Sequence, residues 1–189
     1  MPRLLLALSF AALASSAACT GLREVVPGVY RSPQPAEAQL FHRVEELGLR
    51  TIVCLRGHGE QSAIGERVAV GTGIDFVTVP MSATRLPKPA TLHALWRVAA
   101  TAERPLLLHC RAGVDRSGLL AALVVLHDTG DFERARGQLS LWKGHTGLLG
   151  TAAMDDVLDR YEAYAGRMPF PQWIDEVYAP SLPQERARP

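Results

Sequence analysis

The chain lacks any marked excess of charge of one sign. Its 189 residues include 20 lysines and arginines and 19 aspartates and glutamates, which leaves a formal net charge of +1. General attraction to nucleic acid or to an anionic membrane surface requires a strong positive excess. We therefore expect neither as a partner, and any affinity for a charged ligand must come from a local group of residues.

Cysteine is scarce, and metal-ligand patterns are missing. The three cysteines, Cys19, Cys54 and Cys110, lie far apart in the sequence, so they form neither a disulfide framework nor a zinc-binding pattern. The six histidines show no metal-ligand spacing either. We therefore expect no metal and no cofactor, and each cysteine needs an explanation of its own.

No segment reaches the roughly 20 consecutive apolar residues that a membrane-spanning helix requires. The N-terminus nevertheless carries a shorter apolar stretch at residues 4–13, preceded by Arg3 and followed by small residues. This order is typical of a signal peptide, which we place at residues 1–18. The protein is therefore expected to be exported from the cytoplasm, to the periplasm.

Cys19 directly follows the expected signal peptide. The arrangement resembles that of bacterial lipoproteins, in which the cysteine after the signal peptide is lipidated and anchors the protein. Such signals usually have leucine three residues before the cysteine, where this chain has Ser16. A lipid on Cys19 would be the protein's one link to a membrane, and ordinary cleavage without lipidation is the alternative.

No internal repeat, low-complexity tract or long linker interrupts the remaining sequence. Hydrophobic residues make up 48% of a chain that is long enough for one well-buried domain and short for two. We place this domain at residues 19–180, expect it to be a monomer, and assign residues 181–189 to a loose tail.

Short β-rich segments alternate with segments whose apolar residues recur at helical spacing. The expected strands are residues 25–30 with a break at Pro27 and Gly28, 51–55, 76–79 and 106–109. The expected helices are residues 36–47, 60–70, 89–101, 117–127, 132–142, 151–164 and 172–178. This alternation predicts an α/β fold with a central, mostly parallel sheet of about four to five strands, covered by helices on both faces.

The most informative segment is the loop between the strand expected at residues 106–109 and the helix expected at residues 117–127. It reads His-Cys-Arg-Ala-Gly-Val-Asp-Arg-Ser over residues 109–117. A loop that leaves a buried strand and enters a helix directs several backbone N–H groups and the positive end of the helix dipole at one point. Such a cradle binds a dianionic phosphate.

Three residues of this loop suit chemistry on phosphate. Cys110 lies at the base of the cradle, where the amides and the helix dipole would lower the pKa of its thiol and favour a nucleophilic thiolate. Arg116 can offer a planar guanidinium fork to two phosphate oxygens, and Gly113 permits the tight turn. For Cys110 the alternative role is that of a small core residue. Cys54 has the same default role, with a reversible disulfide to Cys110 as a hypothesis.

The spacing His-Cys-x5-Arg-Ser resembles the active-site motif of the protein tyrosine phosphatase superfamily. Residues 29–35 (VYRSPQP) and 47–56 (LGLRTIVCLR) resemble the early blocks of an atypical dual-specificity branch found in bacteria, fungi and plants. The likeness covers residues 25–178. It implies a cysteine-dependent phosphatase that forms a phosphocysteine intermediate.

The resemblance also implies roles for the residues of the loop. Cys110 would be the nucleophile, and Arg116 would bind the phosphoryl group and its transition state. Ser117 would donate a hydrogen bond that helps the thiolate leave in the second step, and His109 would orient the loop from behind. The loop residues that would surround the phosphate are Arg111, Ala112, Gly113 and Val114.

The general acid has two candidates. Classical members of the superfamily carry an aspartate on a mobile loop before the cysteine, but the corresponding residues 81–88 contain no carboxylate here. Asp75 is nearest to that loop, and its alternative role is that of a turn or strand-edge residue. Asp115 resembles a loop aspartate with this role in lipid-directed and bacterial members, and its alternative role is to cap the following helix. We favour Asp115.

Further basic residues are candidates for a rim that holds a second phosphate or an acidic flank of the substrate. Arg111 is the strongest because it lies within the loop, and Arg85, Lys88 and residues 142–145 (Trp-Lys-Gly-His) are the others. Most basic residues on a protein surface have no such specific role.

Two alternatives to a phosphatase are open at this point. A rhodanese-like sulfurtransferase also holds a cysteine in an anion cradle, but with a loop shorter than the five residues between Cys110 and Arg116. A non-catalytic phosphate-binding module would not need Cys110, Arg116 and Ser117 together. For a phosphatase, the expected substrate is a phosphorylated protein, acted on by a tyrosine or dual-specificity enzyme. An inositol phosphate or phosphoinositide is the alternative substrate.

Overall fold

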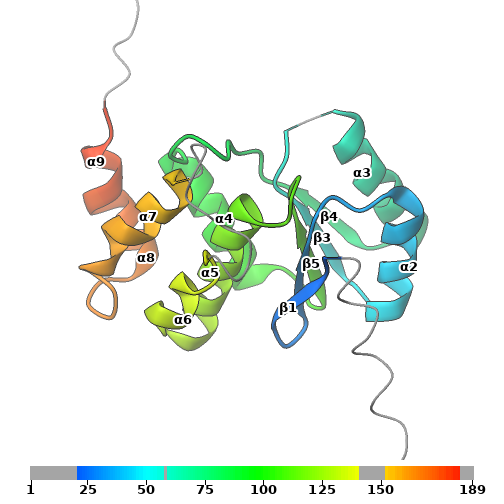
Figure 1. Ribbon diagram of the computed structural model, residues 1–189, viewed down its shortest axis with the longest axis horizontal. Helices are drawn as coiled ribbons and strands as arrows, with labels where there is room; N and C mark the ends of the chain where they lie inside the picture. The colour runs from blue at the N-terminus through cyan, green and yellow to red at the C-terminus, as the bar shows by residue number, and fades with distance from the viewer. Residues whose placement is uncertain (1–20, 58, 141–151, 184–189) are drawn as a thin grey trace, which may run out of the picture.

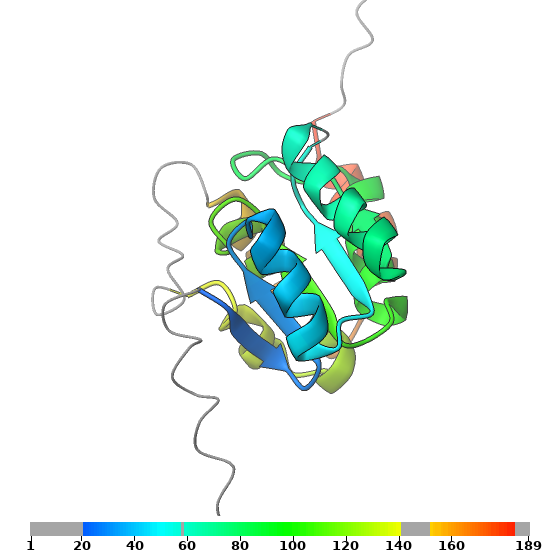
Figure 2. The same cartoon turned by 90° about the vertical axis from the view of Figure 1, so that its right-hand side faces the viewer.

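The computed structural model describes residues 21–57, 59–140 and 152–183. These residues form three layers, with a five-stranded sheet between two groups of helices (Figure 1). Helices α2 (Glu37–Leu47) and α3 (Glu60–Thr72) cover one face, and Figure 2 views the sheet from their side. Helices α4 (Pro89–Thr101) and α5 (Asp115–Thr129) cover the other face.

The sheet has the strand order β1-β2-β5-β3-β4. The strands are β1 (Arg23–Val26), β2 (Val29–Ser32), β3 (Thr51–Cys54), β4 (Asp75–Thr78) and β5 (Leu106–His109). Strands β2, β5, β3 and β4 run parallel, and β1 pairs antiparallel with β2 at one edge. The predicted α/β fold, a mostly parallel sheet covered on both faces, is confirmed.

The strand predicted at residues 25–30, with a break at Pro27 and Gly28, is two antiparallel strands, because the chain reverses at that break. Pro27 and Gly28 form the turn of a hairpin between β1 and β2. Gly28 has a φ of 75°, a left-handed conformation that glycine adopts at little cost. The reversal lets β2 run parallel to β5, with Ser32 beside His109.

The predicted helices are present with shifted ends. Helix α5 begins at Asp115 instead of residue 117, and α6 (Phe132–Arg136) ends before Gly137, well short of the predicted end at residue 142. The C-terminal elements are α7 (Ala153–Glu162), α8 (Phe170–Trp173), the π-helical turn η2 (Ile174–Tyr178) and α9 (Ala179–Ser181). The predicted signal peptide, Cys19 and residues 184–189 of the predicted tail lie outside the described residues.

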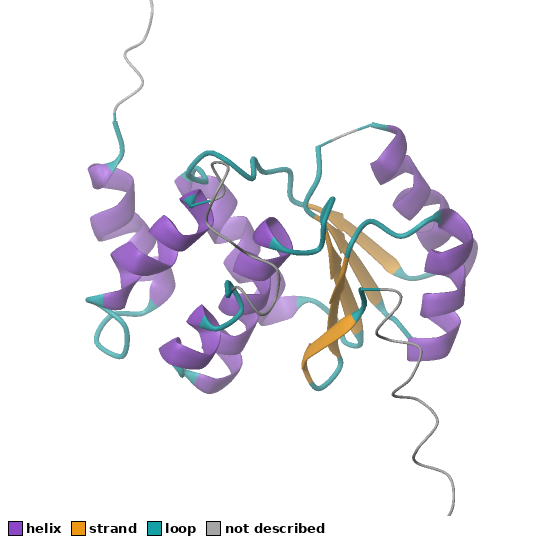
Figure 3. Cartoon of the chain, in the orientation of Figure 1, coloured by secondary structure: helices purple, strands orange, loops and turns teal. Residues whose placement is uncertain are grey.

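Strand β5 lies at the centre of the sheet and is buried on both faces. Leu106 and Leu108 belong to the larger core with α4 and α5, and Leu107 belongs to the smaller core with α2 and α3. Helix α5 is buried without interruption from Ser117 to Leu126. A close-packed interior leaves a strand and a helix of this kind little freedom to shift. The loop between them therefore has a fixed frame, at the edge where the loops after the parallel strands gather (Figure 3).

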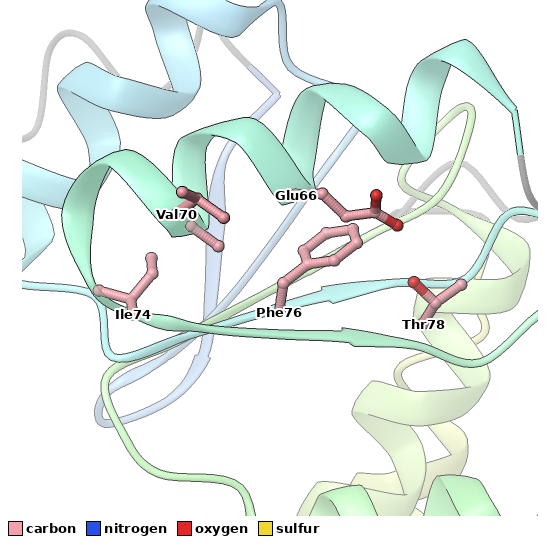
Figure 4. A pocket seen from close by; sticks show the side chains of 6 residues that line it. Glu66, Val70, Ile74, Phe76 and Thr78 are labelled. Atoms are coloured by element: carbon pink, nitrogen blue, oxygen red, sulfur yellow. The ribbon is translucent and has the colours of Figure 1, made fainter.

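A shallow groove of about 370 Å³ lies between α3 and the edge strand β4 (Figure 4). Its lining residues are Glu66, Ala69, Val70, Ile74, Phe76 and Thr78. Phe76 packs closely on α3 because residue 65 is glycine; a Cβ there would lie 2.2 Å from the Phe76 ring. The groove is on the α3 side of the sheet, whereas the loop after β5 leads into α5 on the other side.

Among the described helices, none is long and apolar enough to cross a membrane.

Candidate active site

The loop at residues 110–114 lies at the carboxyl edge of the sheet, between the ends of β2 and β3. His109, the last residue of β5, pairs with Ser32 of β2 and with Cys54 of β3. Ligand sites of open parallel sheets lie at this edge, where the loops of neighbouring strands meet. The structure thus places Cys110 directly after a buried strand and close to a helix N-terminus.

Cys110 forms the base of the loop and is almost fully buried, with 2% of its surface exposed. The backbone N–H of Gly113 donates a hydrogen bond to its Sγ at 3.2 Å, and Ser117 Oγ lies 3.5 Å from the same sulfur. Helix α5 begins immediately after the loop, with Val114 as its N-cap residue. The loop and the helix end therefore direct their donors at one atom.

The pKa of the Cys110 thiol is lowered from its usual value. Burial is the largest single effect and acts to raise it, but hydrogen bonds from Ser117 and Val114, together with the charge of Arg116, outweigh burial. Cys54 shows the contrast, because it is also fully buried and burial raises the pKa of its thiol. A thiolate is therefore favoured at Cys110 and disfavoured at Cys54.

The curl of the loop requires glycine at position 113. Gly113 has a φ of 71° and packs on the backbone of Ser32 and Pro33, where a Cβ would lie 2.3 Å from the Pro33 nitrogen. The N–H of Gln34 donates a hydrogen bond to the carbonyl of Arg111 at 3.2 Å. The segment that follows β2 thus supports the loop from one side.

Arg116 lies in the first turn of α5 and is partly exposed. Its Nη1 donates to the carbonyls of Leu55 and Met81, each at 3.4 Å, so the loops after β3 and β4 hold it. Its Nε is buried and has no hydrogen-bond partner among the described residues. A buried donor without an acceptor costs about 1–3 kcal/mol, and an anion in the cradle would supply that acceptor.

His109 is buried behind the loop and is neutral. Burial, followed by the charges of Arg56 and Arg43, lowers its pKa to about 4. Its two ring nitrogens have no hydrogen-bond partner among the described residues. Its backbone carbonyl, by contrast, accepts the N–H of Leu55 at 3.0 Å. Backbone pairing, rather than a side-chain hydrogen bond, therefore connects His109 to the frame of the loop.

Asp115 is the first residue of α5 rather than its cap. The N-cap residue is Val114 and no side chain caps the helix, so the predicted alternative role of Asp115 as a cap is wrong. Its carboxylate lies in the first turn, where it interacts favourably with the helix dipole. It is partly exposed, and its charge interacts with that of the buried Arg31. Asp115 is therefore the candidate general acid within the cradle.

Asp75 lies at the wrong end of the sheet for that role. It is the exposed first residue of β4 and pairs with Thr51 at the start of β3. Thr51 in turn pairs with Leu106 at the start of β5, whereas Cys110 follows the end of β5. Three residues along a strand span about 10 Å. Asp75 therefore cannot reach a leaving group held at Cys110, and this candidate is wrong.

The predicted basic residues of the rim that the structure describes are exposed. Of the loop residues predicted to surround a phosphate, Arg111 and Ala112 are exposed, Gly113 is buried and Val114 is partly buried. Arg85 and Lys88 are exposed on the loop after β4, whose first residues contact Arg116. Residues 142–145, the other predicted part of the rim, lie outside the described residues.

Neither a disulfide nor a metal cluster is found in the described part of the chain. Cys54 ends β3 beside His109, and neither Cys54 nor Cys110 is in a disulfide. The reversible disulfide between them stays a prediction. Within the described ranges, no group of three or more His, Cys, Asp or Glu side chains could hold a metal ion.

Two buried arginines beneath the cradle were not expected from the sequence. Arg31 in β2 and Arg43 in α2 are 1% and 5% exposed. Their spacing from neighbouring apolar residues indicates that both side chains are buried. Arg31 follows Val29 by two residues in a strand, and Arg43 lies on the apolar face of its helix with Leu40 and Val44. A charged residue at such a position needs partners inside the protein.

In a comparison with known proteins, a family model described as "DSP-PTPase phosphatase fused to NAD+ Kinase" matches residues 18–149. Among curated proteins, the dual specificity protein phosphatase TpbA of Pseudomonas aeruginosa (strain UCBPP-PA14) is 30% identical over 103 residues. This match covers 54% of the present chain and 44% of TpbA. The chain therefore spans about half the length of the curated relatives that it matches.

Solved structures of phosphatases share the fold. The crystal structure of P. aeruginosa TpbA has a TM-score of 0.58 at 23% identity and covers 75% of this chain and 85% of that chain. The core catalytic domain of the PP-IP phosphatase SIW14 from S. cerevisiae has a TM-score of 0.59 at 22% identity, with 75% and 85% covered. A DUF442 protein from Shewanella putrefaciens CN-32 has a TM-score of 0.62 at 18% identity, and the match covers 80% of this chain and 98% of that chain. At these identities the likeness establishes the fold alone.

Proposed function

We propose that this chain, which belongs to the DSP-PTPase phosphatase family, hydrolyses phosphoric monoesters through a phosphocysteine formed on Cys110. The family match over residues 18–149 includes the whole loop at residues 109–117. The observation that carries the proposal is the geometry around a buried sulfur, which accepts the Gly113 N–H at 3.2 Å and lies 3.5 Å from Ser117 Oγ at the start of α5. This environment lowers the pKa of the Cys110 thiol. An inert cysteine of the core has a raised pKa instead, as Cys54 has.

In the first step the Cys110 thiolate attacks phosphorus in line with the leaving group. An S–P bond forms and the P–O ester bond breaks, so the phosphoryl group moves to the sulfur. The N–H groups of the loop and the Arg116 guanidinium stabilise the negative charge on the three equatorial oxygens. Asp115, as general acid, gives a proton to the departing oxygen.

In the second step water attacks phosphorus, the S–P bond breaks and inorganic phosphate leaves. The electron pair of that bond returns to Cys110 Sγ, and the carboxylate left on Asp115 takes the proton of the water. Ser117 Oγ, 3.5 Å from Sγ, donates a hydrogen bond that stabilises the thiolate as it leaves. Cys110 is then a thiolate and Asp115 is protonated, as they were before the first step.

The same features disfavour the two alternatives of other classes. A rhodanese-like sulfurtransferase has a shorter loop around its cysteine than the loop from Cys110 to Arg116. A phosphate-binding module without catalysis has no use for an ionised sulfur beneath the anion. Hydrolysis of a simple aryl phosphate separates a phosphatase from both.

We favour a phosphorylated protein as the substrate, with dual specificity for phosphotyrosine and phosphoserine or phosphothreonine. The support is the relative TpbA, which is named a dual specificity protein phosphatase. A second candidate is an inositol phosphate or phosphoinositide, because Arg111 of the loop and Arg85 and Lys88 of the segment after β4 are exposed, and residues 80–88 contain no carboxylate. Such cations would hold further phosphates of one substrate, and the fold neighbour SIW14 is named a PP-IP phosphatase.

Turnover should depend on the Cys110 sulfur. In Cys110→Ser the nucleophile becomes a hydroxyl that stays protonated, so hydrolysis of p-nitrophenyl phosphate should fall about 10³-fold or more. The wild-type rate should be blocked by vanadate and unaffected by EDTA, and Cys54→Ala is the matched control that keeps the rate. A serine variant as fast as the wild type would contradict the proposal.

Asp115→Asn should slow the hydrolysis of a poor leaving group selectively. A general acid contributes about 10²–10⁴-fold, mostly where the leaving oxygen needs a proton. We expect a loss of this size with phenyl phosphate and a much smaller loss with p-nitrophenyl phosphate. Asp75→Asn, at the other end of the sheet, should change neither rate. Equal losses of Asp115→Asn on the two esters would remove Asp115 from this role.

A substrate panel separates the two substrate classes. We expect phosphotyrosine and phosphothreonine peptides to be hydrolysed with a higher kcat/KM than inositol polyphosphates, measured as released phosphate. If the inositol compounds are preferred, the second candidate replaces the first, and Arg85→Ala should then lower kcat/KM for them. Arg134→Ala, which removes an exposed arginine from α6, is the control.

We also propose that the protein is exported and anchored through Cys19. The support is the order of residues 1–18, a basic start, an apolar stretch and small residues, directly before a cysteine. In a bacterial host the wild type should fractionate with membranes, and Cys19→Ser should move to the soluble periplasmic fraction. Unchanged membrane association would contradict lipidation, and retention in the cytoplasm would contradict export.

A further inference from the structure

Arg31 is a buried cation beneath the cradle to which the mechanism above gives no task. It lies in β2, pairs with Leu108 of β5 and has 1% of its surface exposed. Its Nη1 donates a hydrogen bond to the carbonyl of Gln138, just after α6, at 2.9 Å. Removing a guanidinium group from water is costly unless other groups compensate its charge. The neighbours of Arg31 therefore indicate what the charge does.

The guanidinium group of Arg31 lies against the first turn of α5. A Cβ at Gly118 would be 3.4 Å from Arg31 Nη1, so glycine at this position leaves room for the close approach. The same turn begins with Asp115, Arg116 and Ser117. Arg31 thus connects β2 and the segment after α6 to the helix turn that carries the catalytic side chains.

The negative charges that act on Arg31 belong to the cradle. Burial, followed by the charge of Arg23, lowers the pKa of Arg31 to about 10, so the side chain stays protonated at neutral pH. The two charges that act in the opposite direction are those of Cys110 and Asp115. Arg116, the other cation close to Cys110, lowers the pKa of its thiol. Arg31 is therefore a second, fully buried cation near the thiolate.

We propose that Arg31 is a positioning residue of the active site, which holds the first turn of α5 against β2 and supplies positive charge to Cys110 and Asp115. The inference rests on the proposed function for the catalytic roles of those two residues. Strands β2 and β3 flank β5, so Arg31 acts from the β2 side, while the loops after β3 and β4 hold Arg116 on the other. Arg31 itself does not touch the substrate.

Alkylation of the Cys110 thiol by iodoacetamide tests the charge effect without any turnover. Below the pKa of the thiol, the rate follows the thiolate fraction, which changes about tenfold for each unit of pKa. We expect Arg31→Gln to lower the rate at Cys110 about tenfold at a pH below the midpoint of the wild-type profile. Peptide mass spectrometry distinguishes Cys110 from Cys54 in this measurement.

Arg31→Lys separates charge from geometry. Lysine keeps the positive charge, so the pH profile of Cys110 alkylation should coincide with that of the wild type. A single ammonium group cannot hold both the Gln138 carbonyl and the turn of α5 as the guanidinium does, so kcat for phenyl phosphate should fall about tenfold. This variant decides the matter if Arg31→Gln does not fold, because a wild-type kcat or a shifted profile in Arg31→Lys would overturn the proposal.

Arg43 offers a matched control. It is 5% exposed, donates a hydrogen bond to Ser32 Oγ at 2.8 Å, and the negative charge that acts on it is that of Glu46 rather than of Cys110. Arg43→Gln removes a comparable buried contact and should leave the alkylation profile of Cys110 in place. A profile of Arg31→Gln that coincides with the wild type, or an equal shift in Arg43→Gln, overturns the proposal.

A failure of the proposed function and a failure of the proposed role of Arg31 are distinguishable, because alkylation of Cys110 needs no substrate. An inactive protein whose Cys110 profile still shifts in Arg31→Gln would contradict the proposed function and retain the effect of Arg31 on the thiolate. An active enzyme with an unshifted profile would retain the function and remove the proposed role of Arg31.

Discussion

The hydrogen bonds that meet at Sγ of Cys110 are the interaction on which the rest of the structure depends. Burial by itself raises the pKa of a thiol, and Cys54 shows this effect one strand away. At Cys110 the Ser117 hydroxyl, backbone N–H groups and the charge of Arg116 reverse the direction. The same sulfur is thus shielded from water while its environment favours the thiolate, the form that attacks phosphorus.

The fold serves this interaction by fixing where the donors lie. Strand β5 is enclosed by neighbours and by helices on both faces, and α5 is buried along most of its length. The loop between them closes with Gly113 against the backbone of Ser32 and Pro33, where a Cβ would lie 2.3 Å from the Pro33 nitrogen. The buried guanidinium of Arg31 is costly, and its interaction with the charges of Cys110 and Asp115 compensates part of that cost.

The chemistry of the site was predictable from the sequence because it is local. Residues 109–117 are consecutive, so their order alone places a thiol, a guanidinium group and a hydroxyl around one helix end. Asp75 stayed a second candidate for the general acid because separation along the chain does not say which end of a parallel strand a residue occupies. Arg31 was missed because charged residues are exposed by default, and its hydrogen-bond partner Gln138 lies 107 residues away in the sequence.

The most direct test of the account is to look for phosphorus on sulfur. The wild-type enzyme would be mixed with excess p-nitrophenyl phosphate, quenched in acid at early times, digested, and the peptide that contains Cys110 examined by mass spectrometry. The account predicts one phosphoryl group on Cys110, formed as fast as the first equivalent of p-nitrophenol is released. Active turnover with no phosphoryl group on that peptide, or with the group on another residue, would contradict it.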